Sequence, residues 1–440
     1  MQDAFFALAD VIAASLKNNE GYLARFSGEG SDFVRFNRSA VRQAGGVEQR
    51  YLTLELFEGR RHAARTVSLT GDAREDPAQI KASVTALRDV LADTPEDPHF
   101  LVNTTPQSST RILPATLPCA EDAVDAILKA GAGHDMVGFY ASGPIHRGFA
   151  NSFGQRNWDT VQAFNIDLSF YLRADKAVKM SHAGTQWNPA AFTAKADAAK
   201  AQLLALARPA KTITPGGVRV YLAPAAMEEI MGMLSWGGFG LAEHRTATTP
   251  LIKMVEQGVR LSSALTLTEN SGEGLAPRFQ EEGFVKPDSV TLIGGGAYKD
   301  CLVSPRSAAE FGVAPNGADG SESPASLDMA AGTLPSAEAL RTLGTGVYIG
   351  NLWYLNYSDR NACRLTGMTR FATFWVENGE IAAPLNVMRF DDTVYRMLGG
   401  NLVALTAERD LLMSTDTYEA RSTRSMRLPG AIIDDFRMTL

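Results

Sequence analysis

The order helix, alternating strands, helix occurs twice within residues 1–215, and this repeated order constrains the fold more than any other feature. Apolar residues recur with helical spacing over 5–16. The sequence then takes the two-residue period of strands over 46–57 and 65–69, with glycines between the runs. An Asp-Pro pair, which suits a helix start, opens a second apolar-periodic segment at 76–90. The pattern predicts an antiparallel sheet with helices packed on it.

The same order follows a segment rich in Thr, Ser and Pro. A helix is expected over 121–130, strands over 136–142, 145–151 and 161–172, and an alanine-rich helix over 188–208. Ser142-Gly143-Pro144 separates two of these strands and is typical of a turn. The two units have the same element order but no convincing residue-by-residue repeat.

Short strands and turns dominate from Val218 onward. The clearest strand patterns are 218–222, 290–293, 347–357, 371–377 and 381–389. We therefore predict an α+β protein with two N-terminal helix-plus-antiparallel-sheet layers followed by a β-rich C-terminal domain. The domains expected are 1–110, 111–215 and 216–440.

Composition excludes several classes of partner. The chain has 440 residues, 45% of them hydrophobic, and a net charge of -7. This balance argues against nucleic acid as the main partner, because such binding depends on clustered Lys and Arg. No apolar run is long enough to cross a bilayer, and no basic leader precedes the first helix. Three scattered cysteines fit a reducing compartment, so we expect a cytoplasmic protein without a membrane partner.

The histidines are too far apart to form a local zinc site. A zinc helix of the HExxH kind needs its histidines about four residues apart, which places both on one face. The six histidines here are nowhere closer than the pair His134 and His146; the others are His62, His99, His182 and His244. The cysteines form no CxxC pair. A metal site would have to be assembled from distant segments.

Four segments resemble the TldD/PmbA family, whose members were once described as modulators of DNA gyrase and are classed as metallopeptidases. The segments are Asp32–Asn37, Asn151–Gly154, the run from Leu265 to Gly283 with Gly294–Gly296 after it, and Phe374–Ile381. Each is weak alone, since Asn378-Gly379 for example is ordinary hairpin chemistry. They follow the family's order over nearly the whole chain, which makes the resemblance more specific than any one motif.

The resemblance implies a division into two subtypes. Catalytic TldD-like members carry HExxxH on a helix of the C-terminal domain and bind zinc with these histidines and a later cysteine. PmbA-like or TldE-like members lack the pair and form complexes with a catalytic partner. The stretch Trp236–Arg245, which we take as the corresponding one, has a single histidine, in the order Glu-His. The resemblance therefore implies the non-catalytic subtype, with zinc in the partner subunit and no catalytic or metal residues in this chain.

Weak site candidates have simpler interpretations. His244 is a possible ligand of a composite metal site, but a surface or capping histidine is the commoner role. Cys363 is the candidate thiolate, but a buried thiol that acts as a small apolar residue is commoner. Glu281 to Gly283 read as a polar turn fixed by the glycine. The segment Ala150–Gly154 is a near miss to GxSxG and lies between strands, where no nucleophile elbow forms.

Three functions stay open at this point. The first is a non-catalytic subunit of a TldD/TldE-type cytoplasmic peptidase complex that shapes peptide binding, in a homo- or hetero-oligomer with a TldD-like catalytic subunit. The second is a divergent metallopeptidase that acts alone with a dispersed metal site. The third is a peptide-binding or regulatory protein without hydrolytic activity. The sequence leaves open whether the chain is an enzyme by itself, and it does not indicate which residues bind peptide.

Overall fold

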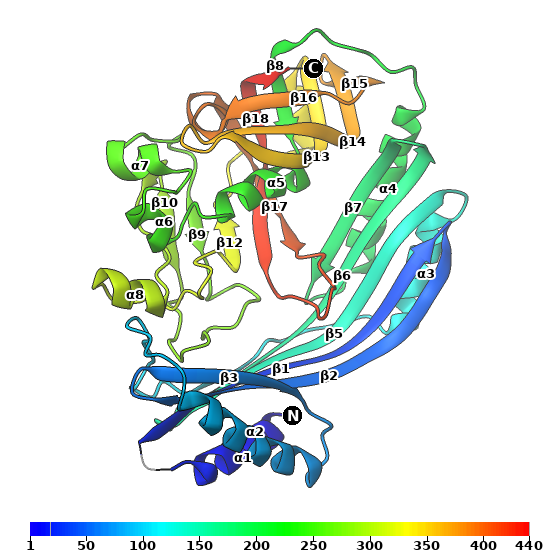
Figure 1. Cartoon of the computed structure of the whole chain (residues 1–440). Coiled ribbons are helices and arrows are strands. Elements are labelled where there is room, and N and C mark those ends of the chain that lie inside the picture. Colours follow the sequence, from blue (N-terminus) through cyan, green and yellow to red (C-terminus); the bar gives the residue numbers. More distant parts are fainter. Residues whose placement is uncertain (18, 440) are drawn as a thin grey trace.

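The computed structural model describes residues 1–17 and 19–439. It has the expected α+β class, with an antiparallel N-terminal sheet, helices packed on that sheet, and a C-terminal half rich in strands. Figure 1 shows the N-terminal sheet curving around the C-terminal half. In the described part of the chain, no helix is long and apolar enough to cross a membrane.

Seven strands form the N-terminal sheet, in the order β3-β2-β1-β5-β6-β4 with β7 paired to β6. They are β1 (Glu20–Asn37), β2 (Ala40–Glu58), β3 (Arg61–Ser68), β4 (Ser109–Ile112), β5 (Asp135–Asn151), β6 (Arg156–Arg173) and β7 (Lys176–Gly184). The antiparallel pairing of β1 with β5 joins the strands of both predicted units in one sheet. The boundaries near residues 110 and 215 stay predictions.

The predicted turn at Ser142–Pro144 is wrong, because β5 runs through it. Gly143 lies at φ 136° inside the strand, and a Cβ there would meet the Gly30 carbonyl oxygen at 2.1 Å. The glycine thus permits a close approach of two backbones within the sheet rather than a chain reversal.

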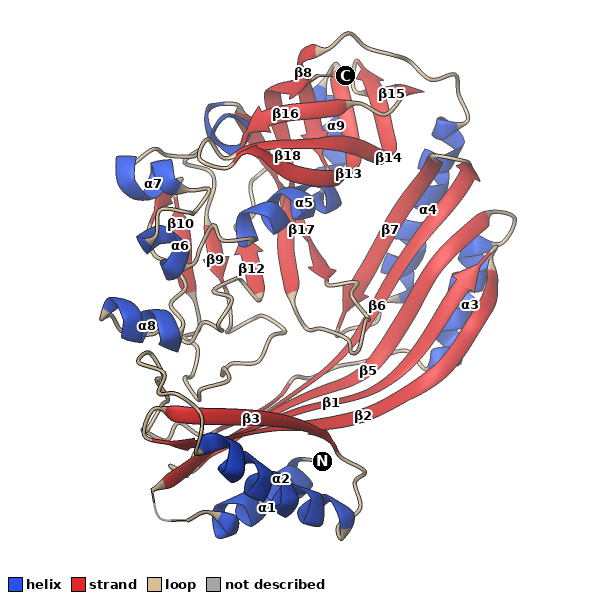
Figure 2. Cartoon of the chain, viewed as in Figure 1, coloured by secondary structure: helices blue, strands red, loops and turns tan. Residues whose placement is uncertain are grey.

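Helices cover the convex side of this sheet, as Figure 2 shows. They are α1 (Gln2–Ser15), α2 (Glu75–Leu91), α3 (Ala120–Gly131) and α4 (Pro189–Leu206). The first two pack with β1 and β2 residues such as Phe26 and Leu54, and the last two pack with residues such as Tyr140 and Phe170 of β5 and β6. Asn188 caps α4 by accepting hydrogen bonds from the Ala190 and Ala191 amides. The concave side is left to face the C-terminal half.

The C-terminal sheet has eleven strands. They are β8 (Gly216–Leu222), β9 (Leu267–Glu269), β10 (Val290–Gly294), β11 (Ala297–Tyr298), β12 (Ser326–Met329), β13 (Gly346–Asp359), β14 (Arg364–Glu377), β15 (Glu380–Pro384), β16 (Arg389–Thr393), β17 (Leu402–Met413) and β18 (Ser425–Met438). The order β18-β16-β14-β13-β8 closes on itself, because β8 also pairs with β18. Asn378 and Gly379 both have positive φ at the β14–β15 turn, as the hairpin interpretation predicted.

Short helices accompany these strands. They are α5 (Pro224–Ser235), α6 (Leu241–Arg245), α7 (Ile252–Gln257), α8 (Pro305–Phe311), α9 (Ala339–Leu343), a 3₁₀ turn at Ser336–Glu338 and a π-helical turn at Arg396–Gly400. Helix α5 follows β8 directly and packs against β13 and β18. It is the twelve-residue helix on which the candidate site is built.

The hairpin of β17 and β18 extends from the C-terminal sheet to the N-terminal sheet (Figure 1). Near its tip Arg421 is 6% exposed. Its guanidinium donates to Ser31 Oγ at 3.0 Å and to the Ala163 carbonyl at 2.7 Å. These bonds to β1 and β6 fix the loop between the two sheets.

Candidate functional site

A large cavity, of about 770 Å³, lies where the concave side of the N-terminal sheet faces the C-terminal half. One wall is α5, and the opposite wall comes from β6 and β7 through Asp167 and Lys179. The β17–β18 hairpin contributes residues 412–416 and 424–426. The N-terminal sheet and the C-terminal half therefore both contribute residues to this cavity.

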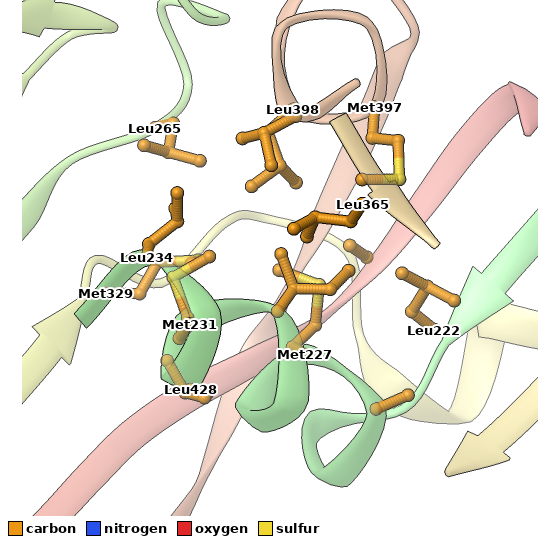
Figure 3. Packing of buried hydrophobic residues seen from close by; sticks show 14 of the residues in the cluster. Leu222, Met227, Met231, Leu234, Leu265, Met329, Leu365, Met397, Leu398 and Leu428 are labelled. Atoms are coloured by element: carbon orange, nitrogen blue, oxygen red, sulfur yellow. The ribbon is translucent and has the colours of Figure 1, made fainter. Parts of the chain in front are cut away.

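The sequence of α5 determines which of its residues reach the cavity. Met227, Ile230, Met231 and Leu234 are fully buried with the spacing of one helix face. Figure 3 shows Met227, Met231 and Leu234 in the core with Leu222 and Leu428. The opposite face lines the cavity with Ala225, Glu228, Glu229, Gly232 and Met233. Burial of the apolar face thus sets the direction of the two glutamates.

Two adjacent carboxyl groups dominate this wall. Burial, and then the charge of Glu229, raises the pKa of Glu228 from 4.5 to about 7. Burial also raises the pKa of Glu229. Across the cavity, Lys179 Nζ lies 3.1 Å from Asp167 Oδ2, and burial raises the pKa of that aspartate. A group that titrates near pH 7 is suited to exchange protons or to bind a cation.

Two polar atoms at the cavity have no hydrogen-bond partner among the described residues. They are Ser235 Oγ, at the end of α5, and Glu243 Oε2, on α6. Ser235 is 8% exposed, so water does not fully replace the missing partner. Such atoms are available to a bound ligand.

His244 lies on α6 and is buried. Its Nε2 is 2.8 Å from the Gly238 carbonyl, and its Nδ1 is 3.4 Å from the Tyr298 hydroxyl. Burial lowers the pKa of the His244 imidazole. Both ring nitrogens therefore have partners within the protein, and the burial of His244 is inconsistent with the surface position that the sequence allowed.

Cys363 is fully buried between β13 and β14, and burial raises the pKa of its thiol to about 12. Its environment is apolar, formed by core residues such as Leu365 and Val394. Within residues 1–17 and 19–439, no group of three or more His, Cys, Asp or Glu side chains is placed to hold a metal ion. Of the two weak metal candidates, His244 is therefore hydrogen-bonded within the protein, whereas Cys363 lies in an apolar environment.

His146 and Gly283, two further residues considered from the sequence, make hydrogen bonds within the protein. His146 Nδ1 lies 2.9 Å from Thr160 Oγ1 on the neighbouring strand. Gly283 has φ 88°, and its carbonyl accepts a hydrogen bond from Gln155 Nε2 at 2.7 Å. The Glu281–Gly283 segment is a turn, as the sequence indicated.

The stretch Trp236–Arg245, which the sequence suggested as the counterpart of the zinc helix, lies at the edge of this cavity. Of the stretch Trp236–Arg245, only Trp236, Gly237 and Glu243 line the cavity, whereas α5 forms its wall. The available signal was an acidic pair, Glu228-Glu229, set in an otherwise apolar helix. That pattern is common on solvated helix faces, so only the fold distinguishes it.

Comparisons with known proteins give a family for the C-terminal half and similar folds for nearly the whole chain. Residues 215–440 match the family described as the PmbA/TldA metallopeptidase C-terminal domain. A Thermotoga maritima structure, described as that of a candidate modulator of a DNA gyrase, is similar with 14% identity and a TM-score of 0.79, over 99% of this chain and 100% of that chain. TldE from Thermococcus kodakarensis is similar with 14% identity and a TM-score of 0.77, over 99% and 100%.

A third similar structure, from Bacteroides thetaiotaomicron, is likewise described as a candidate modulator of DNA gyrase. It has 13% identity and a TM-score of 0.75, over 99% of this chain and 98% of that chain. None of the curated proteins compared with this sequence matches it. At these identities the structural likeness establishes the fold.

Proposed function

Because the chain belongs to the PmbA/TldA metallopeptidase family, which its residues 215–440 match, we propose that it is a non-catalytic subunit of a cytoplasmic TldD/TldE-type peptidase complex. In this proposal a partner that carries HExxxH supplies the zinc. The present chain forms part of the chamber that holds the peptide. It needs no metal of its own.

The observation that carries the proposal is the composition of α5. Within the described part of residues 215–440, it is the one helix longer than seven residues. The spacing of HExxxH falls on Glu228, Glu229 and Met233, and all three line the large cavity. In this assignment α5 keeps the glutamate and has lost both histidines. A carboxylate and a thioether are a poor substitute for two imidazoles as zinc ligands.

The cavity has properties that suit a peptide. Its volume is within the range of ligand-binding clefts. Leu355, Leu412 and Met426 supply apolar surface, and Glu228 with Glu229 supplies carboxylates for an ammonium or guanidinium group. We propose that the peptide is extended and adds to the β-rich domain by main-chain hydrogen bonds, a mode that tolerates varied sequences.

Co-expression with an HExxxH-bearing relative tests this function. The proposal predicts that the two chains co-purify and that the complex cleaves peptides, whereas this chain alone does not. Replacement of the HExxxH glutamate of the relative by glutamine should abolish cleavage. Failure of the chains to associate, or full activity of the relative alone, would overturn the proposal.

A variant of this chain tests the role of α5 within the complex. Glu229→Gln should raise the KM for a peptide with a free amino group and leave the zinc content unchanged, because the residue contacts peptide and not metal. Glu256→Gln, on the exposed side of α7, is the matched control and should leave KM unaltered. Loss of zinc in Glu229→Gln would contradict this role.

A further inference from the structure

A second cavity, of about 400 Å³, lies at the seam between the N-terminal sheet and the loops of the C-terminal half. The sheet contributes residues 25–27 of β1 and 147–149 of β5. The C-terminal half contributes residues 276–277, 279–281, Lys286 and the segment 422–424 that precedes β18. The same Arg424 also lines the large cavity, so the two cavities are neighbours.

Basic groups outnumber acidic groups around this second cavity. The basic residues are Arg25, Arg147, Lys286 and Arg424, and the acidic residues are Glu281 and Asp319. Two of the cations are already paired. Arg25 pairs with Glu55, and Arg424 Nη2 lies 3.2 Å from Asp319 Oδ2. Arg147 and Lys286 form no ion pair with any described residue.

Arg147 is a partly buried cation that has no carboxylate partner among the described residues. Among the described residues, its one hydrogen bond to protein joins Nη1 to the adjacent His146 carbonyl at 2.9 Å. Burial lowers the pKa of the Arg147 guanidinium, although nearby Glu29 and Asp159 act in the opposite direction. A guanidinium stays charged in proteins, so its burial is unfavourable unless an anion accompanies it.

The two nearby carboxylates are engaged by other donors. Asp159 Oδ2 accepts from Arg111 Nε at 2.6 Å. Glu29 Oε2 accepts from Gln49 Nε2 and from the Arg421 amide, each at 3.0 Å. Neither lies within ion-pair distance of Arg147. The remaining donors of Arg147 are therefore directed to the cavity side of β5, which Arg147 shares with Phe149.

We propose that this second cavity binds an oxyanion through Arg147 and Lys286, and that its ligand is the C-terminal carboxylate of a peptide held in the cleft. A guanidinium binds a carboxylate with two parallel hydrogen bonds, and a lysine adds charge from the opposite wall. The identification of the anion as a peptide carboxylate rests on the proposed function. The oxyanion site itself rests only on the charges and the cavity.

A pair of peptides that differ in one group tests the proposal on the purified full chain. The probes are N-acetyl-tetra-alanine with a free carboxylate and the same peptide as its carboxamide, compared by calorimetry. We expect the free acid to bind at least about tenfold more tightly, as the loss of a charge-assisted pair implies. The preference should disappear in Arg147→Gln and in Lys286→Gln. It should persist in Arg74→Gln, whose side chain is 92% exposed.

Binding of inorganic phosphate tests the oxyanion site independently of peptide binding. Phosphate should bind the wild-type chain and compete with the free acid, and both effects should be absent in Arg147→Gln. If neither peptide binds, the chamber proposal fails, and phosphate binding that depends on Arg147 still supports the oxyanion site. Equal affinity for acid and amide, or a preference that survives in Arg147→Gln, overturns the carboxylate assignment. Absence of phosphate binding overturns the site.

The unfolding temperature of each variant shows whether a loss of anion binding results from a loss of folding. Because Arg147 is partly buried without a carboxylate partner among the described residues, Arg147→Gln should keep or raise the unfolding temperature while it removes anion binding. A lowered unfolding temperature would indicate that the guanidinium is satisfied within the protein, and this result would also contradict the proposal. Lys286→Gln gives an independent readout of the same site.

Discussion

The backbone amide of Arg421 donates to Oε2 of Glu29 at 3.0 Å, so the β17–β18 hairpin is bonded to the first strand of the N-terminal sheet. The hairpin belongs to the C-terminal sheet by pairing but ends among β1, β5 and β6. Residues on both sides of Arg421 line the two cavities. The shape of the binding cleft therefore depends on this contact.

Arg421→Met tests the importance of the anchor. The change keeps an apolar stem but leaves Ser31 Oγ and the Ala163 carbonyl without their donor. We expect the free energy of unfolding to fall by about 2–4 kcal/mol, since buried acceptors become unsatisfied. Chemical denaturation measures this value. Arg74→Met should change it by less than about 0.5 kcal/mol, and equal effects of both substitutions would argue against the anchor.

Glu228→Gln tests the raised pKa of the Glu228 carboxyl on α5. The pKa of Glu228 is raised from 4.5 to about 7 in the folded chain, so folding favours its protonated form. Ionisation of Glu228 is less favourable in the folded chain than in the unfolded chain. The free energy of unfolding should therefore fall as pH rises from about 4.5 to about 7. The glutamine variant should be more stable than wild type by about 1–3 kcal/mol at pH 8 and nearly equal to it at pH 4.5. A stabilisation that does not vary with pH would refute the shifted pKa.

Gly283→Ala tests the turn at the seam. Gly283 has φ 88°, and a Cβ there would lie 2.8 Å from the Phe149 ring. Strain and the displaced ring should together lower the free energy of unfolding by about 2–4 kcal/mol. Gly59→Ala, with φ 60° and open space at its Cβ, controls for backbone strain alone and should cost less. Equal costs would show that packing against Phe149 contributes nothing.

The three thiols should react in a fixed order with a disulfide reagent at pH 8. Cys119 is exposed, whereas Cys301 and Cys363 are buried. Burial raises the pKa of the Cys363 thiol to about 12, so its reactive thiolate is scarce. One thiol should react fast in the native chain and three in denaturant. If the fast-reacting thiol were absent in Cys363→Ala but still present in Cys119→Ala, the reagent would be reaching Cys363. That result would contradict the burial of Cys363.

Local patterns made much of the fold predictable. The alternating residues of 46–57 predicted a strand, and the alanine-rich run of 188–208 predicted a helix, because each pattern depends only on its own segment. Pairing between distant strands leaves no comparable local trace, and so the union of both N-terminal units through β1 and β5 was not foreseen. The turn predicted at Gly143 was wrong for a related reason. A glycine required for close backbone approach has the same sequence signature as one in a turn.

The site was less predictable than the fold. Glu228 and Glu229 look like a solvated helix face until Asp167 and Lys179 are placed opposite them. Arg147 is an ordinary alternating residue of a strand, and its lack of an acidic partner emerges only from three-dimensional proximity. His244 attracted attention because histidine suggests metal chemistry, yet its nitrogens are occupied by Gly238 and Tyr298.

The zinc content and peptidase activity of the purified chain, measured alone and in complex with an HExxxH-bearing relative, test the central claim most directly. The account predicts no stoichiometric zinc and no cleavage for this chain alone, and one zinc per pair with cleavage for the complex. It also predicts that His244→Ala leaves the zinc content and the activity of the complex unchanged. Stoichiometric zinc and cleavage by the chain alone, both lost in His244→Ala, would contradict it.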